Sequence, residues 1–190
     1  MPRPASDKLQ RLTGAATTLT HTRGFERTTI ADIAAEAGVA SGSVYYYFKT
    51  KDDVGRAIVD AVLAGDADRF AAWDAIPDAR DRLTAYIDAL VGRADALRQF
   101  GSPVGALCTD LRKYSAELGD EAAAIVRQSV DWAAEQFVAL GFSADAAAAR
   151  ALHLVTGMEG AALLSHALDT TEPLEREAAH LKRWIANTKV

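Results

Sequence analysis

A run of three consecutive aromatic residues, Tyr45, Tyr46 and Tyr47, lies in a short segment between Gly38 and Phe48. The segment is predicted to be a helix, in which successive side chains point about 100° apart. The three phenol rings therefore cannot share one buried face. At least one of them must point away from the protein, which favours a helix that contacts another molecule.

The residues before this segment predict another short helix. Thr29 precedes Ile30 and has Asp32 three positions further on, which is the arrangement of a capping box at a helix N-terminus. Gly38 is predicted to end the helix, because glycine accepts the left-handed backbone of a C-terminal cap. Two short helices joined by a glycine-containing turn form the helix-turn-helix pattern, whose second helix is available for the DNA major groove. The apolar face of the first of these helices consists of Ile30, Ile33, Ala34 and Ala37.

Helical geometry assigns different directions to the side chains of the tyrosine segment. With Val44 as the origin, Phe48 lies at about 40°, so these two side chains are predicted to face inward. Tyr46 lies at about 200° and is predicted to face the groove together with Gly42 and Ser43. The tyrosines on either side of it are placed to reach phosphate oxygens. The residues predicted to contact DNA are Thr28, Thr29, Ser41, Gly42, Ser43, Tyr45, Tyr46, Tyr47, Lys49 and Lys51.

The rest of the chain predicts an all-α fold, because apolar residues recur at helical spacing and β-branched alternation is scarce. A threonine-to-acid cap at Thr50 and Asp53 predicts the start of a helix that continues to Leu63, and Lys51 with the backbone amides there is predicted to hold a phosphate. The segment around Trp73 and Pro77 is predicted to lead into a second domain. The other predicted helices are residues 7–23, 78–97, 103–118, 121–140, 144–167 and 173–187.

Charge is distributed unevenly along the 190 residues. Residues 1–56 hold eight Lys or Arg and six Asp or Glu, a net charge of +2, which leaves −7 for the rest of a chain whose net charge is −5. A mildly basic head on an acidic body is compatible with a protein that touches a polyanion only through its head. No apolar run approaches the length of a membrane span, and residues 1–4 lack the apolar region of a signal peptide, so a cytoplasmic protein is expected.

The first 60 or so residues resemble the DNA-binding head of TetR-type transcriptional repressors. The resemblance implies a DNA-binding domain over residues 1–64 and a ligand-binding and dimerisation domain over residues 65–190. It further implies a homodimer that binds operator DNA and responds to a small hydrophobic effector. One departure is Ala40, where the family usually has a serine that caps the recognition helix; Ser41 is expected to cap it one residue later. The matching positions are Gly24, Phe25, Thr28, Thr29, Ile30, Ile33, Ala34, Ala37, Gly38, Val39, Gly42, Ser43, Val44, Tyr45, Tyr47, Phe48, Lys49 and Lys51.

A second, shorter resemblance lies in the body. Residues 102–107, followed by Asp110 and Leu111, resemble a segment of the LmrA-type subgroup, which is associated with drug or flavonoid response. The usual cysteine before the proline is Ser102 here, and the chain's one thiol lies at Cys108.

The effector site and the dimer interface are expected among the later helices. Aromatic and apolar residues at helical spacing are either core or the lining of a ligand cavity. Small residues on the helix at 144–167, among them Gly157, Gly160 and Ala161, allow another helix to approach closely. That helix is expected in a four-helix homodimer interface with the last one, although packing within one chain is the ordinary alternative. The predicted ligand-pocket residues are Phe70, Trp73, Tyr86, Phe100, Leu107, Trp132 and Met158.

Two hypotheses from other classes stay open beside a ligand-responsive repressor. Cys108 is a candidate for a thiol-based redox-responsive repressor, because an accessible thiolate of low pKa is oxidisable, whereas a buried cysteine is usually inert. A small helical enzyme or an adaptor that binds no DNA is the other. The sequence contains no glycine-rich phosphate loop, catalytic triad or metal-ligand spacing, so no enzyme activity, metal or cofactor is predicted.

Overall fold

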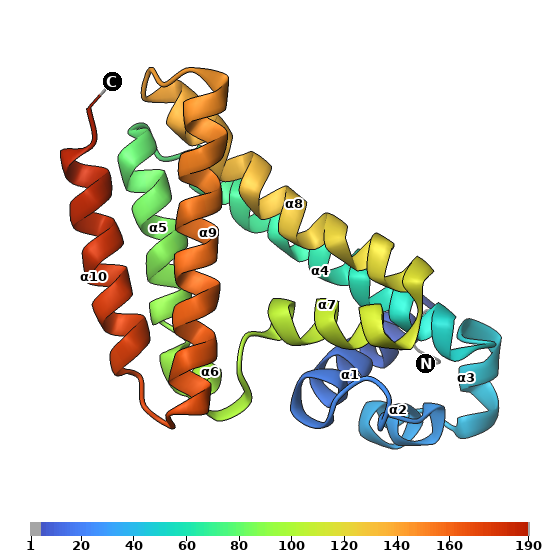
Figure 1. Cartoon of the computed structure of the whole chain (residues 1–190). Helices are drawn as coiled ribbons and strands as arrows, with labels where there is room; N and C mark the ends of the chain where they lie inside the picture. Colours follow the sequence, from blue (N-terminus) through green and yellow to red (C-terminus); the bar gives the residue numbers. More distant parts are fainter. Residues whose placement is uncertain (1–4, 190) are drawn as a thin grey trace. The chain divides into compact units, whose positions relative to one another are not determined.

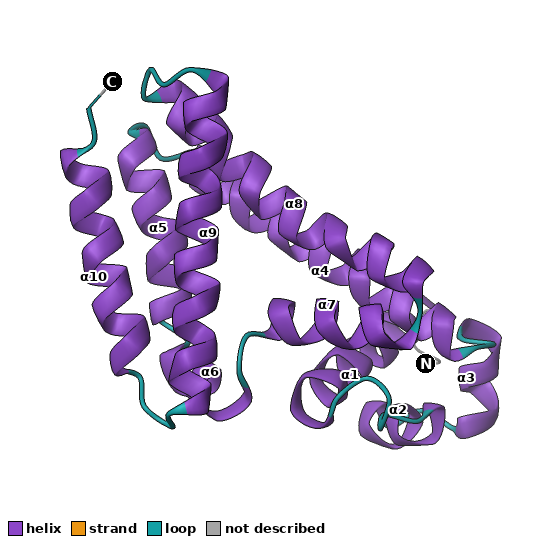
Figure 2. Ribbon diagram, in the orientation of Figure 1, coloured by secondary structure: helices purple, strands orange, loops and turns teal. Residues whose placement is uncertain are grey.

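The computed structural model describes residues 5–189, and every regular element in that range is an α-helix (Figure 2). This confirms the predicted all-α fold. Residues 1–4, in which the sequence predicted no signal-peptide region, lie outside the described residues. The helices, labelled in Figure 1, are α1 (Ala5–Arg23), α2 (Ile30–Ala37), α3 (Ser41–Tyr47), α4 (Lys51–Asp74), α5 (Ala79–Val91), α6 (Ala94–Phe100), α7 (Pro103–Tyr114), α8 (Ala116–Ala139), α9 (Ala144–Ala167) and α10 (Glu172–Asn187).

The chain divides into two compact units. The first, here called the N-terminal unit, takes in the residues up to Ala64 together with Ala106–Ile125. The second, the C-terminal unit, takes in Gly65–Gly105 and Val126–Val190. The functional division at residue 64 stays a prediction, and residues 106–125 pack with the N-terminal unit.

The helix-turn-helix of the N-terminal unit has the predicted caps. The Thr29 side chain accepts a hydrogen bond from the Asp32 amide, and the Asp32 carboxylate accepts one from the Thr29 amide, so the capping box of α2 is present. Gly38 follows α2 with φ of 59°, in the left-handed region that favours glycine. The Arg11 guanidinium of α1 donates hydrogen bonds to the carbonyl groups of Ala37 and Gly38, which are orphan acceptors at the end of α2.

Phe25 forms the centre of the N-terminal unit. Its backbone amide donates a hydrogen bond to Asp110 Oδ2 at 2.9 Å, and its buried ring packs edge-on against Tyr114 with 5.1 Å between centroids. A Cβ at Gly55 would lie 3.0 Å from Leu118 Cδ1 and 3.3 Å from the Phe25 ring, so α4 approaches this core through a glycine. Phe25 thereby holds residues 106–125 against the helix-turn-helix.

The C-terminal unit is a helical bundle with a continuous apolar core. Helix α10 lies against α5 and α9, and α6 lies against α9 (Figure 1). Helix α9 contributes fully buried residues at helical spacing, among them Leu154 and Met158, and they pack with Leu83 and Ile87 of α5 and Leu181 of α10. This core fixes the helices that surround the cavity described below.

Several predicted helix boundaries were wrong. Helix α4 continues through Gly65 to Asp74, because one glycine costs a helix only about 1 kcal/mol and the apolar face continues beyond it. The predicted helix 78–97 is broken after Val91, where Gly92 and Arg93 form a turn before α6. The predicted helix 103–118 ends at Tyr114 and α8 begins at Ala116.

The prediction for Ser41 was also wrong. Ser41 is the first residue of α3 and Ala40 occupies the N-cap position, with no side-chain hydrogen bond to cap the helix. The predicted 144–167 helix is confirmed as α9, and α10 begins one residue before the predicted start. In the part of the chain that the structure describes, no helix is both long and apolar enough to cross a membrane.

Two glycines of α4 provide a matched test of this packing. We expect Gly55→Ala to lower the free energy of unfolding by about 1–3 kcal/mol, because the added methyl group crowds the buried Leu118 and Phe25 side chains. Gly65→Ala should raise it by about 0.5–1 kcal/mol through helix propensity, since its Cβ would meet only the Arg69 side chain, at 3.9 Å. Urea denaturation of both variants measures the difference. A more stable Gly55→Ala variant would contradict the described packing.

Candidate nucleic-acid interface and ligand cavity

The side chains of α3 take the predicted directions. Val44 and Phe48 are buried in the N-terminal unit, so they anchor the helix. The Tyr46 side chain is 80% exposed and that of Tyr45 is 59% exposed. Tyr47 is half-buried, and its ring packs edge-on against the Tyr46 ring, with 5.1 Å between centroids. The phenol rings of Tyr45 and Tyr46 are therefore largely exposed to solvent.

The start of α3 is open on the same side. Ser41 and Gly42 are exposed and Ser43 is half-buried. A Cβ at Gly42 would meet no atom within 4 Å. The exposed Lys49 follows the helix and adds positive charge beside it. This face combines small residues, phenols and a cation, which suits contact with base edges and phosphates in a groove.

The two threonines before α2 have different environments. Thr28 is buried, and its hydroxyl donates a hydrogen bond to the Gly24 carbonyl at 2.9 Å. Thr29 is exposed and its side chain caps α2. Hydrogen bonds from Thr29 lower the pKa of the Asp32 carboxyl. Thr28 therefore supports the turn, and Thr29 is the one whose side chain is at the surface.

Lys51 is half-buried, and its ammonium group contacts other residues of the N-terminal unit. Its ammonium donates a hydrogen bond to the Glu26 carbonyl at 2.5 Å and lies 5.0 Å from the centre of the Phe25 ring. Burial lowers the pKa of Lys51, and the negative charge of Glu26 opposes that shift. The Asp53 carboxylate accepts hydrogen bonds from the amides of Lys49 and Thr50, so the predicted cap of α4 is confirmed. The phosphate contact of Lys51 stays a prediction.

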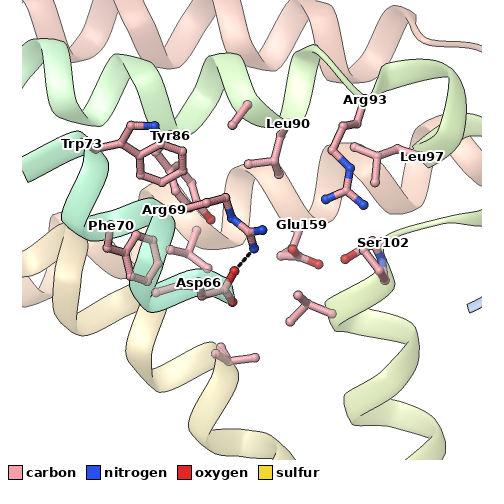
Figure 3. A pocket seen from close by; sticks show the side chains of 16 residues that line it. Asp66, Arg69, Phe70, Trp73, Tyr86, Leu90, Arg93, Leu97, Ser102 and Glu159 are labelled. Atoms are coloured by element: carbon pink, nitrogen blue, oxygen red, sulfur yellow. Dashed lines mark hydrogen bonds and ion pairs between the residues drawn. The ribbon is translucent and has the colours of Figure 1, made fainter. Parts of the chain in front are cut away.

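The C-terminal unit contains a cavity of about 150 Å³ that opens to solvent. Figure 3 shows the aromatic side chains of Phe70, Trp73 and Tyr86 at one end, Glu159 and Arg93 at the other, and Asp66 and Arg69 between them. It is lined by Asp66, Arg69, Phe70, Trp73, Tyr86, Ala89, Leu90, Arg93, Leu97, Ser102, Pro103, Val104, Val126, Ser129, Val155 and Glu159.

Aromatic rings form one side of this cavity. Phe70 and Trp73 come from adjacent positions of the α4 face and have ring centroids 5.7 Å apart, and Tyr86 of α5 lies edge-on to Trp73 at 6.1 Å. Behind them Trp132 stacks on Phe70 at 4.8 Å, and its indole N–H donates a hydrogen bond to Asp74. Burial raises the pKa of the Tyr86 phenol, with a smaller contribution from the charge of Glu159. The Tyr86 hydroxyl is therefore neutral at physiological pH.

The other side of the cavity is charged. Asp66 is buried and forms an ion pair with Arg69 one helical turn along α4 (Figure 3). Burial raises the pKa of the Glu159 carboxyl, and a hydrogen bond with the Ser102 side chain opposes that shift. Arg93 approaches from the turn before α6. The cavity can therefore accept an amphipathic molecule with an aromatic part and a polar part.

The predicted ligand-pocket residues fall into two groups. Phe70, Trp73 and Tyr86 line the cavity. The remaining four do not line it: Trp132 and Met158 are buried in the core of the C-terminal unit, Leu107 is buried in the N-terminal unit, and Phe100 is half-buried near the end of α6. Whether any of the seven binds a ligand stays a prediction.

The charged residues of the lining were not predicted from the sequence. Asp66, Arg69 and Trp73 follow one another at the three- and four-residue spacing of a single helix face, which is a readable signal once α4 is known to continue past Gly65. Glu159 gave no comparable signal, because an acid among the small residues of α9 is equally compatible with an exposed site.

Cys108 lies in α7 and is half-buried in the N-terminal unit. Its Sγ atom lies 3.4 Å from the Ala122 carbonyl oxygen. Its redox role stays a prediction. Among residues 5–189 no group of three or more His, Cys, Asp or Glu side chains is arranged to hold a metal ion.

Two known protein families match this chain, one in its N-terminal part and one in its C-terminal part. Residues 12–58, which contain α2 and α3, match the family described as bacterial regulatory proteins, tetR family. Residues 79–180, more than half of the chain, match the C-terminal domain described as transcriptional regulator LmrA/YxaF-like. The chain belongs to the TetR family of transcriptional regulators.

Solved structures of TetR regulators share the fold. One from Legionella pneumophila has a TM-score of 0.82 at 17% identity, covering 96% of this chain and 98% of that one. The regulatory protein TetR from Rhodobacter sphaeroides has a TM-score of 0.79 at 25% identity, covering 92% and 96%. E. coli NemR, in its reduced form, has a TM-score of 0.75 at 22% identity, covering 93% and 96%.

A curated relative matches over a shorter range. The uncharacterized HTH-type transcriptional regulator YvdT of Bacillus subtilis (strain 168) is 32% identical over 69 residues, which is 36% of each chain. The match thus spans about a third of that relative's length. Both resemblances found in the sequence are confirmed, and this TetR-family regulator is a DNA-binding protein with an LmrA/YxaF-like body.

Proposed function

We propose that this TetR-family regulator is a cytoplasmic, dimeric repressor that leaves its operator when a small, largely hydrophobic molecule enters the cavity of the C-terminal unit. The observation that carries the DNA half of the proposal is the exposure of Tyr45 and Tyr46 on a helix anchored by Val44 and Phe48. Large exposed phenols at the tip of a helix-turn-helix are suited to a groove and its phosphates.

The effector half rests on the cavity and on helix α7. The residues at its start, Pro103 and Val104, line the cavity, and further along the same helix Asp110 and Tyr114 contact Phe25 in the core of the N-terminal unit. A ligand that moves the start of this helix therefore has a physical route to the helix-turn-helix. It shifts the equilibrium only by its difference in affinity between the operator-binding and released states.

The dimer half rests on exposed leucines of α9. Leu152 and Leu163 are eleven positions apart and so lie within about 20° of each other on the helix, and the exposed Leu164 lies about 100° to one side of Leu163. The small residues of α9 are mostly used within the chain: a Cβ at Gly157 would meet Glu177 and Leu181, and Ala162 is fully buried. The exposed leucines, together with Gly160, where a Cβ would meet no atom within 4 Å, support dimerisation.

Operator binding is tested by substitutions around α3. Tyr46→Ala should weaken binding to DNA from the regulator's own upstream region by about 10–100-fold, while binding to unrelated DNA changes little. Lys49→Ala should weaken binding to both and lower the salt dependence by about one counterion. Gel-shift titrations at several salt concentrations measure both effects.

The matched control is Lys113→Ala, which removes an exposed lysine from α7 and should leave both affinities and the salt slope unchanged. If Tyr46→Ala kept wild-type affinity and preference for the upstream DNA, the α3 docking proposal would be wrong.

The dimer is tested at Leu163, whose side chain is 65% exposed. Leu163→Glu should shift the protein from dimer to monomer, because a carboxylate in an apolar interface loses its hydration without a partner. Val138→Glu is the matched control, since Val138 is an apolar residue, 50% exposed, on a different helix, α8. Sedimentation velocity measures the masses. A Leu163→Glu variant that sediments like the Val138→Glu variant would exclude this face from the interface.

A further inference from the structure

Two guanidinium groups line the polar side of the cavity. Arg69 comes from α4, and Arg93 comes from the turn between α5 and α6 (Figure 3). Burial lowers the pKa of Arg69, and the positive charge of Arg93 lowers it further. Both guanidinium groups line the same cavity, and like charges in one cavity repel each other.

The acids of the cavity leave this pair incompletely neutralised. Asp66 forms an ion pair with Arg69. Glu159 is hydrogen-bonded by Ser102, and its Oε2 lies 3.1 Å from where a Cβ on Gly105 would be, in the first turn of α7, where the helix dipole favours negative charge. Within residues 5–189 no acidic side chain lies at ion-pair distance from Arg93. Glu159 forms no ion pair among these residues either, and burial favours its neutral form, so Arg93 is the charged group of the lining that is left for a ligand.

The aromatic side limits the size of the occupant. A cavity of about 150 Å³ accepts a benzene-sized ring, as an engineered apolar cavity of that size does. Phe70, Trp73 and Tyr86 offer ring faces and edges to such a group. Since the cavity is open to solvent, a substituent on the ring can extend towards the arginines.

We propose that the effector is a small aromatic carboxylate, with its ring among Phe70, Trp73 and Tyr86 and its carboxylate bound by Arg69 and Arg93. A guanidinium binds a carboxylate through paired, charge-assisted hydrogen bonds, and an anion between two guanidinium groups removes their repulsion. This inference rests on the proposed function, because it names the chemical class that enters the proposed effector cavity.

An aromatic amine fits this cavity less well. Its ammonium group would face both guanidinium groups, and the acid available to it, Glu159, already has the Ser102 hydroxyl and the start of α7 as partners. A neutral alcohol would leave the repulsion between the arginines unchanged. Charge therefore distinguishes three ligands that share one ring.

Benzoate, benzylamine and benzyl alcohol are the probes that test this inference. Isothermal titration of the full-length regulator with each probe at pH 7 should show benzoate binding at least about tenfold more tightly than the other two, an advantage that shrinks as salt rises. Arg93→Ala should weaken benzoate binding by about tenfold or more and leave benzyl alcohol binding unchanged. Arg98→Ala is the matched control, because Arg98 pairs with Asp95 and Asp169 and does not line the cavity.

Three results would overturn the inference: benzylamine or benzyl alcohol binding as tightly as benzoate, benzoate binding that survives Arg93→Ala, or no binding of any probe. A gel shift of the same ligand-free preparation measures operator binding separately. Loss of operator binding in that gel shift would count against the proposed repressor, whereas normal operator binding with any of the three results would count against the aromatic carboxylate alone.

Discussion

The anchoring of α3 by two buried side chains, Val44 and Phe48, is the constraint on which the nucleic-acid face depends. The helix has seven residues and no side-chain cap, so its own hydrogen bonds give it little stability. Packing must therefore hold it, and packing Val44 and Phe48 on one side forces Tyr46, the middle of the three tyrosines between them, to the opposite side. Conversion of either anchor to a polar residue would remove part of the packing that sets the direction of the phenols.

The C-terminal unit places charged groups and aromatic rings in the lining of one cavity. Trp132 stacks behind Phe70 and gives the aromatic side a rigid backing. On the polar side Asp66 forms an ion pair with Arg69. Glu159 is hydrogen-bonded by Ser102 and lies beside the first turn of α7. The charge of Arg93 remains available to a ligand. In this account the aromatic side chains bind the ring of the ligand, and the arginines select its charge.

Features set by local periodicity are predictable from the sequence. The inward direction of Val44 and Phe48, the capping box at Thr29 and the full extent of α9 all follow from spacing within one helix. Features set by tertiary packing are not: α4 continues through Gly65, and residues 106–125 join Phe25 in the N-terminal unit although they follow a stretch of the C-terminal unit. Of the cavity lining, Phe70, Trp73 and Tyr86 were predicted, whereas Arg93 and Glu159, which are 66 positions apart, come to one cavity only through the fold.

The central claim is that the exposed face of α3 contacts operator DNA. Chemical nitration of tyrosines in the full-length protein, with and without DNA from its own upstream region, measures this directly by peptide mass spectrometry. The account predicts that Tyr45 and Tyr46 are nitrated in the protein alone and protected by that DNA but not by unrelated DNA at matched salt, while the buried Tyr86 stays unmodified throughout. Nitration of Tyr46 at the same rate in the bound and unbound protein would contradict it.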